Sequence, residues 1–257
     1  NFRFTQNAPA EHKVGPYYDD EGYVEHSDSQ KGLVFSLYHR ARRIMLGFKY
    51  RMLKKKTKGK RLLDVGSASG YFLEYMREKS YEVEGVEISQ KARELCKART
   101  GITAHEPSAL IQKSIPGSFD LISLWHVLEH VYTLADYFEA FAHYLKDDGV
   151  LAIAMPNHLC LDETYYGKYW CAYDVPRHLW HFERKTFKRF AESRGFKLVG
   201  TKRLPLDPFY NAMVSASYKK GFRFLPWTLY IGTLSFLNAL INKNKASSLV
   251  YLLKKTN

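Results

Sequence analysis

A short turn and the acid that follows the next apolar run set the chemistry that this chain can perform. The sequence reads Leu-Leu-Asp64-Val-Gly66-Ser67-Ala68-Ser-Gly70 and, after a helical stretch, Glu-Val-Glu-Gly-Val-Glu87-Ile88. Gly66 and Gly70 allow the backbone to approach a ligand closely. The carboxylate of Glu87 can accept hydrogen bonds from both hydroxyls of a ribose. This segment therefore predicts a nucleoside site.

The spacing of the glycines disfavours two common phosphate sites. A dinucleotide turn needs G-x-G-x-x-G, and a P-loop ends in Gly-Lys-Ser/Thr, so that backbone amides can hold phosphate groups. Here Ala68 stands in place of the middle glycine, and Asp64 puts an acid in front of the turn. An acid at this place would repel a pyrophosphate and attract a cationic ligand, so we expect neither a nicotinamide oxidoreductase nor an NTPase.

Short apolar runs alternate along the chain with stretches of helical periodicity. We expect strands at 61–65, 82–87, 102–105, 119–125, 149–155, 196–203 and 247–254, and helices near 70–79, 89–99, 133–146 and 184–194. This alternation predicts an α/β protein with a doubly wound, mostly parallel sheet. In such a sheet ligands bind at the carboxyl ends of the strands.

These segments resemble the class I S-adenosylmethionine-dependent methyltransferases, whose first motif usually has glycine where this chain has Ala68. Residues 119–130 and 148–157 are similar to the family's fourth and fifth strands with their loops. The resemblance implies a Rossmann-like sheet of seven strands whose last strand, 247–254, is antiparallel. It also implies S-adenosylmethionine as cofactor, bound by Asp64, Gly66, Ser67, Ala68, Gly70, Glu87, Ile88, Trp125 and His126.

The segment His126-Val-Leu-Glu129-His130 also matches H-x-x-E-H, the zinc signature of inverted metalloproteases. That chemistry needs both histidines on one face of a helix and a third ligand downstream. Here the motif stands at the end of a buried strand, where related methyltransferases have a similar sequence. We therefore expect no metal, and we expect Glu129 and His130 to order the loop or to face the substrate.

An aromatic-rich segment at 160–182 is the expected acceptor site. Its Asp174-Val-Pro-Arg177-His178-Leu-Trp-His181-Phe run resembles a block in bacterial methyltransferases related to the ubiquinone-biosynthesis O-methyltransferases. His178, and after it His181, are candidate bases for the proton of an oxygen acceptor, and Arg177 could hold an anionic group of the substrate. The alternative is structural: Asp174 and Arg177 pair and brace a long loop.

The net charge of +13 is concentrated in two appendages. Between Lys31 and Arg61 there are twelve basic residues and no acid, around apolar residues at helical spacing, which predicts a cationic N-terminal cap helix within residues 1–58. Residues 59–257 form the expected cofactor-binding domain, with a helical insertion at about 208–244. Within it, 224–241 carries no charge, but a polar stripe of Thr228, Gly232, Ser235 and Asn238 argues against a membrane span. A packed helix or lid is favoured, and contact with an anionic membrane surface is the alternative.

Together these features predict an S-adenosylmethionine-dependent methyltransferase that acts on an oxygen, or another nucleophile, of a small-molecule or lipid-linked acceptor. Three cysteines without C-x-x-C spacing fit the cytoplasm, and the basic appendages allow peripheral contact with the inner membrane face. A nucleic-acid methyltransferase would explain the charge, but a base-methylating enzyme carries a proline-containing turn where this chain reads Ser123-Leu-Trp-His126. A non-catalytic nucleoside-binding protein of the same fold is the remaining alternative.

Overall fold

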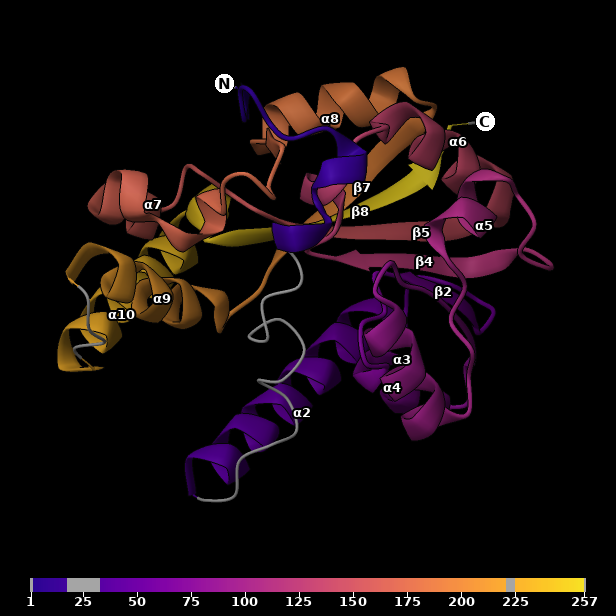
Figure 1. Cartoon of the computed structure of the whole chain (residues 1–257), viewed down its shortest axis with the longest axis horizontal. Coiled ribbons are helices and arrows are strands. Elements are labelled where there is room, and N and C mark those ends of the chain that lie inside the picture. The colour runs from indigo at the N-terminus through magenta and orange to yellow at the C-terminus, as the bar shows by residue number, and fades with distance from the viewer. Residues whose placement is uncertain (1, 18–32, 221–224, 257) are drawn as a thin grey trace. The chain divides into compact units, whose positions relative to one another are not determined.

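The computed structural model describes residues 2–17, 33–220 and 225–256, and Figure 1 traces the whole chain. The chain divides into two compact units. Unit 1 contains residues 1–14, 125–134 and 152–256, and unit 2 contains residues 15–124 and 135–151. Residues 18–32 of the expected N-terminal loop lie outside the described residues.

Six strands form a mixed sheet in the order β3-β2-β4-β5-β8-β7. Their bounds are β2 (Arg61–Val65), β3 (Glu82–Val86), β4 (Phe119–Trp125), β5 (Leu145–Pro156), β7 (Phe196–Arg203) and β8 (Ser248–Lys255). β2 pairs in parallel with β3 and β4, whereas β8 is antiparallel to β7. The expected Rossmann-like α/β class and the antiparallel last strand are therefore confirmed.

The sheet has six strands where we expected seven. Residues 102–105 contribute a single parallel bridge, between Val86 and His105. The extended stretch is short because Gly101 ends one helix in the left-handed region and Pro107 begins the next. Within this stretch, the His105 N–H donates to the Gly85 carbonyl at 2.8 Å, and the His105 carbonyl accepts from the Glu87 N–H at 2.9 Å.

Unit 2 holds the glycine turn between a buried strand and a helix. Its helices are α2 (Leu33–Leu53), α3 (Tyr71–Arg77), α4 (Gln90–Thr100), α5 (Pro107–Ile111) and most of α6 (Leu134–Tyr144). Leu62 and Leu63 of β2 are fully buried, as in a parallel sheet covered on both faces. Gly70 starts α3 with a φ of 82°, and a Cβ there would lie 2.7 Å from the Cys96 sulfur. Glycine is therefore required at this position.

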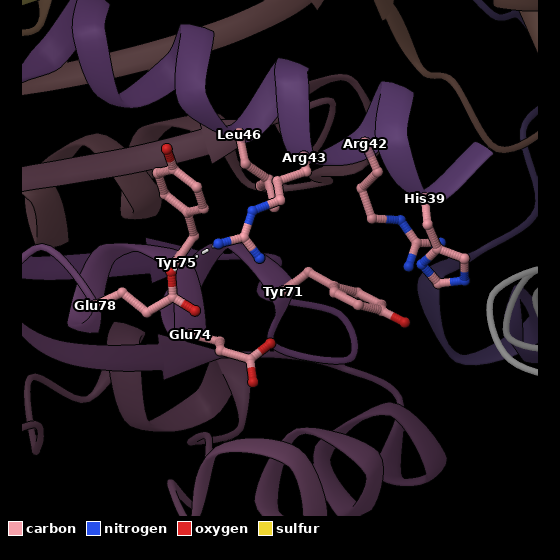
Figure 2. A pocket seen from close by; sticks show the side chains of 8 residues that line it. All are labelled: His39, Arg42, Arg43, Leu46, Tyr71, Glu74, Tyr75 and Glu78. Atoms are coloured by element: carbon pink, nitrogen blue, oxygen red, sulfur yellow. Dashed lines mark ion pairs between the residues drawn. The ribbon is translucent and has the colours of Figure 1, made fainter. Parts of the chain in front are cut away.

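The basic helix α2 packs on α3, around a pocket shown in Figure 2. Arg43 pairs with Glu78 across it at 3.5 Å. The guanidinium carbons of Arg42 and Arg99 lie 3.9 and 3.7 Å from the centroid of the Tyr71 ring. The Arg42 contact attaches α2 to α3, the helix that follows the glycine turn, and the Arg99 contact attaches α4 to it. We therefore interpret this pocket as a packing feature.

Unit 1 holds the remaining helices and a small second sheet. Its elements are β1 (Arg3–Phe4), α7 (Leu161–Tyr166), β6 (Trp180–His181), α8 (Arg184–Ser193), α9 (Asp207–Lys220) and α10 (Leu225–Ile241), with short 3-10 turns that include η3 (Leu128–His130). β1 and β6 pair antiparallel. Helices α9 and α10 follow β7 and precede β8, where a helical insertion was expected, and they pack on each other and on α7 (Figure 1). Among the described helices, none has the length and apolar character needed to cross a membrane.

Candidate functional site

Glu87 lies directly after β3 and beside the glycine turn. Its Oε2 accepts a hydrogen bond from the Ala68 N–H at 2.9 Å, and its Oε1 accepts one from the Ser89 N–H at 2.9 Å. The residue is only 3% exposed. Because each carboxylate oxygen can accept more than one hydrogen bond, the two amides orient the group and still leave it able to accept hydroxyls. The next residue, Ile88, exposes its side chain.

The backbone of the glycine turn is fixed by hydrogen bonds to the end of β3. The N–H groups of Gly66 and Ser67 both donate to the Val86 carbonyl, at 2.7 and 3.0 Å, which ties the turn to the end of β3. Ala68 has a φ of 47°, a left-handed conformation that costs an alanine about 1 kcal/mol or more and explains why the family prefers glycine here. The buried Ser67 hydroxyl has no hydrogen-bond partner within the part of the chain that the structure describes. A polar ligand would supply that partner, so the turn fits a nucleoside.

Asp64 is buried under the turn at the end of β2. The Ser123 hydroxyl of β4 donates to its Oδ1 at 2.5 Å. Burial raises the pKa of Asp64 to about 7. The hydrogen bond from Ser123 and the charge of Lys49 lower this pKa, but burial has the larger effect. Ser123 was not among the predicted site residues. Ser123 could have been identified from the register of β2 and β4, because it lies opposite Asp64 in their parallel ladder.

Trp125 ends β4 and His126 follows it, and both belong to unit 1. His126 is left-handed, with a φ of 60°, and its N–H donates to the Ala154 carbonyl at 3.0 Å. Its imidazole lies 3.1 Å from an Asp207 oxygen and 3.4 Å from a Glu129 oxygen. Burial would lower the pKa of His126, but these two carboxylates raise it to about 10. The His126 side chain is therefore a cation held by two acids, and main-chain contact of Trp125 or His126 with a cofactor stays a prediction.

The H-x-x-E-H segment does not form the helix that the metalloprotease mechanism needs, because residues 128–130 form the 3-10 turn η3. Its second histidine and its glutamate instead meet a residue of the acceptor segment. One ligating atom each from Glu129, His130 and His178 lie within 4.8 Å of one another. The meeting of His178 with these two residues could not be predicted from the sequence, because the members of the cluster come from two distant segments.

The acceptor segment places Arg177 and His178 in one loop of unit 1, and His181 on the short strand β6 that follows. Arg177 donates to the Asp174 carboxylate at 2.6 Å, which supports a bracing role for that pair. His178 donates from Nδ1 to the Ala172 carbonyl at 2.8 Å, and its Nε2 lies 3.7 Å from an Asp174 oxygen. His181 lies on β6 with its ring edge against Tyr173. Burial, together with the charge of His178, lowers the pKa of His181 to about 4, so its imidazole is neutral near pH 7.

Residues 37–201 match the methyltransferase domain family. Over 98 residues the chain is 34% identical to a ubiquinone biosynthesis O-methyltransferase of Burkholderia multivorans, a match that covers 35% of this chain and 42% of that protein. The match thus spans less than half of the length of such curated relatives.

Solved structures show the same fold. A SAM-dependent methyltransferase from Archaeoglobus fulgidus has a TM-score of 0.57 at 20% identity, covering 87% of this chain and 100% of that one. The magnesium protoporphyrin IX methyltransferase from Synechocystis PCC 6803, with bound SAH, has a TM-score of 0.60 at 13% identity, covering 96% and 100%.

The family match covers more than half of the chain and includes the glycine turn, Glu87 and the acceptor segment. The chain therefore belongs to the methyltransferase domain family, as a class I S-adenosylmethionine-dependent methyltransferase.

Proposed function

We propose that this chain transfers a methyl group from S-adenosylmethionine to an oxygen of a small-molecule or lipid-linked acceptor. The observation that carries the proposal is the buried Glu87 carboxylate, fixed by two backbone amides beside the glycine turn. When bound, the cofactor supplies a methyl group on a cationic sulfur. The acceptor class rests on the acceptor-segment block and on the curated relatives, which are named for ubiquinone biosynthesis.

Six of the predicted site residues have side-chain roles under this proposal. Glu87 accepts the ribose hydroxyls, the Ser67 hydroxyl gains a polar partner, and Asp64 sets the electrostatic field under the turn. In unit 1, His178 or His181 takes the proton of a hydroxyl acceptor, and Arg177 orients an anionic group of that acceptor. Alignment of the acceptor oxygen with the methyl carbon supports the reaction more than acid chemistry does, because the sulfur departs neutral.

Calorimetry with S-adenosylmethionine and with its demethylated product tests the cofactor site. We expect both to bind, and we expect Glu87→Ala to weaken binding by about 1–3 kcal/mol, the loss typical of charge-assisted hydrogen bonds. Glu84→Ala is the matched control, because Glu84 lies on the same strand but pairs with His105 at 2.9 Å. Binding of NAD instead, or equal affinities for wild type and Glu87→Ala, would contradict the assignment.

Turnover needs a second measurement. We expect incubation of cell extract with isotopically labelled cofactor to give labelled small molecules or lipids, detected by mass spectrometry, and the label to vanish with Glu87→Ala. Label in nucleic acid would favour the nucleic-acid alternative. Cofactor binding without label in any acceptor would favour a non-catalytic protein of this fold.

We also propose that α10 touches an anionic membrane, where a lipid-linked acceptor would be found. The faces of this helix are inverted relative to an ordinary surface helix. The side turned into the protein carries Thr228, Ile231, Gly232, Ser235 and Ala239. The exposed side carries Leu225, Leu229, Tyr230, Leu237, Leu240 and Ile241, and Ile241 is 89% exposed. The polar stripe therefore faces inward, and large apolar residues face outward.

A buried acid supports this orientation of α10. Asp162 of α7 is fully buried, and its Oδ1 accepts hydrogen bonds from Ser235 at 2.6 Å and Ser247 at 2.7 Å. A Cβ on Gly232 would lie 2.8 Å from the ring of Phe209, so α9 and α10 are in close contact there. Rotation of α10 to bury its leucines would remove a donor from a buried carboxylate, which is costly.

Charge favours a lipid surface as the partner of this face. Tyr210 and Tyr218 of α9 are exposed as well, and the exposed Lys219, Lys243 and Lys245 lie near the ends of the two helices. Contiguous apolar patches are unusual on a monomer unless they meet a partner. Apolar insertion combined with attraction to anionic headgroups gives the two signals that reversible membrane binding requires.

A further inference from the structure

The cluster of Glu129, His130 and His178 contains side chains that the methyltransferase fold does not require for cofactor binding. One ligating atom from each residue lies within 4.8 Å of the other two. Glu129 and His130 belong to η3, after β4, and His178 belongs to the loop before β6. A main-chain hydrogen bond from the Leu179 N–H to the Glu129 carbonyl, at 2.7 Å, holds the two segments together.

Both histidines are oriented as metal ligands are. His178 uses Nδ1 to donate to the Ala172 carbonyl at 2.8 Å, and the Nδ1 of His130 lies 3.2 Å from the Arg177 carbonyl. A ring nitrogen that faces a carbonyl oxygen carries the proton, so the lone pair of a neutral imidazole lies on Nε2. Metal-binding histidines typically show this arrangement, in which a backbone carbonyl fixes the tautomer and the ring direction.

Glu129 gives the second, independent observation. It is 1% exposed, and its Oε1 forms an ion pair with the His126 imidazole at 3.4 Å. Its Oε2 has no hydrogen-bond partner among the described residues. A buried carboxylate oxygen without a partner is costly, and a cation at the cluster would supply one.

We propose that Glu129, His130 and His178 bind one divalent transition-metal ion. Two imidazoles and one carboxylate form a donor set that suits zinc, iron(II) or cobalt(II), and three protein ligands leave a position open for water or for an oxygen of the acceptor. The H-x-x-E-H motif thus supplies two ligands. Its first histidine, His126, pairs with Asp207 and Glu129, and a histidine of the acceptor segment completes the donor set. This role toward the acceptor rests on the proposed methyl transfer, although metal binding itself does not.

The test is a titration of the whole chain, purified without a polyhistidine tag and stripped with a chelator, with cobalt(II) chloride. We expect visible absorption bands that saturate at one cobalt ion per chain and vanish when zinc displaces the cobalt. We expect Glu129→Gln and His178→Ala each to weaken cobalt binding by at least about tenfold. His181→Ala is the matched control, because its ring is near His178 but outside the cluster, and we expect it to bind cobalt like wild type. Glu129→Gln keeps the shape of the side chain, which guards against loss of folding.

The outcomes separate this inference from the proposed function. Absence of cobalt bands in a wild-type chain that binds S-adenosylmethionine would overturn the metal site and leave the methyltransferase proposal intact, with His178 as base. Equal cobalt binding by wild type and Glu129→Gln would also overturn it. Cobalt binding in a chain that fails to bind S-adenosylmethionine would support the metal site and overturn the proposed function.

Discussion

At the scale of single residues, Asp64 shows how one buried acid links the stability of the chain to pH. Its carboxyl group receives a hydrogen bond from Ser123, yet burial raises its pKa to about 7. In an unfolded chain an aspartate titrates near 3.9. Between these two values the folded state binds more protons than the unfolded state does, so the contribution of Asp64 to stability falls as pH rises.

This linkage predicts a specific difference between wild type and Asp64→Asn. The variant lacks the titrating group, so its stability relative to wild type should increase from about pH 4 to about pH 7 and then level off. Urea unfolding of both proteins at several pH values measures this difference, and the pH response of the other groups cancels in the comparison. A stability difference that stays constant across this range would show that Asp64 titrates normally in the folded chain.

Residue types and spacing identified the turn because a nucleoside site needs local features: glycines, and an acid at the end of the next strand. Glu87 and Ser67 lie at the turn as expected. Ser123 and Asp207 were missed because their roles depend on partners distant in sequence. The register of β2 and β4 places Ser123 against Asp64, and the helical insertion brings Asp207 to His126.

At the scale of elements, Asp162 organises the helices of unit 1. Besides the two serine hydroxyls, it accepts hydrogen bonds from the Trp170 indole at 2.9 Å and from the Asn211 amide at 3.4 Å. These donors come from α9, α10, the residue before β8 and the segment after α7. The carboxylate therefore ties four segments together, and hydrogen bonds to a charged group are among the stronger ones in a protein interior.

We expect Asp162→Ala to destabilise the chain by about 3 kcal/mol or more, because it leaves several buried donors without an acceptor. Asp162→Asn should cost less, since one amide oxygen can still serve the two serines. Glu192→Ala is the surface control, with an effect within about 0.5 kcal/mol. Unfolding by urea, followed through tryptophan fluorescence, gives the three values. Equal stability of Asp162→Ala and Glu192→Ala would mean that the network contributes nothing net.

Periodicity predicted most elements well but left the orientation of one helix open. The strands expected at 61–65, 119–125 and 196–203 match β2, β4 and β7, because apolar runs bounded by turns are local signals. The inward direction of the stripe on α10 could not be predicted. A helical wheel separates a polar face from an apolar face, but it does not show that a buried acid on α7 attracts the polar one.

At the scale of the whole molecule, charge is distributed unevenly along the chain. From Arg184 to the C-terminus there are fifteen basic residues and two acids, Glu192 and Asp207. Both acids are already paired, Glu192 with Lys188 at 3.5 Å and Asp207 with His126 at 3.1 Å. The segment that carries the apolar face of α10 therefore also carries an uncompensated positive charge, which favours anionic surfaces over neutral ones.

Vesicle binding tests whether this charge and the outward face of α10 act together. We expect co-sedimentation with vesicles that contain phosphatidylglycerol but not with pure phosphatidylcholine, weakening as salt shortens the Debye length from roughly 10 Å at 0.1 M to roughly 3 Å at 1 M. Combined Leu229→Ser, Leu237→Ser and Ile241→Ser substitutions should lower the affinity at least about tenfold, because they remove apolar area that would enter the bilayer. These three side chains are exposed, so the fold should persist. Val199→Ser is the control, because Val199 lies on β7 and is about as exposed as Leu229 and Leu237. If the triple variant binds as tightly as wild type, or if wild type ignores anionic vesicles at low salt, the outward face of α10 does not contact lipid and serves another partner.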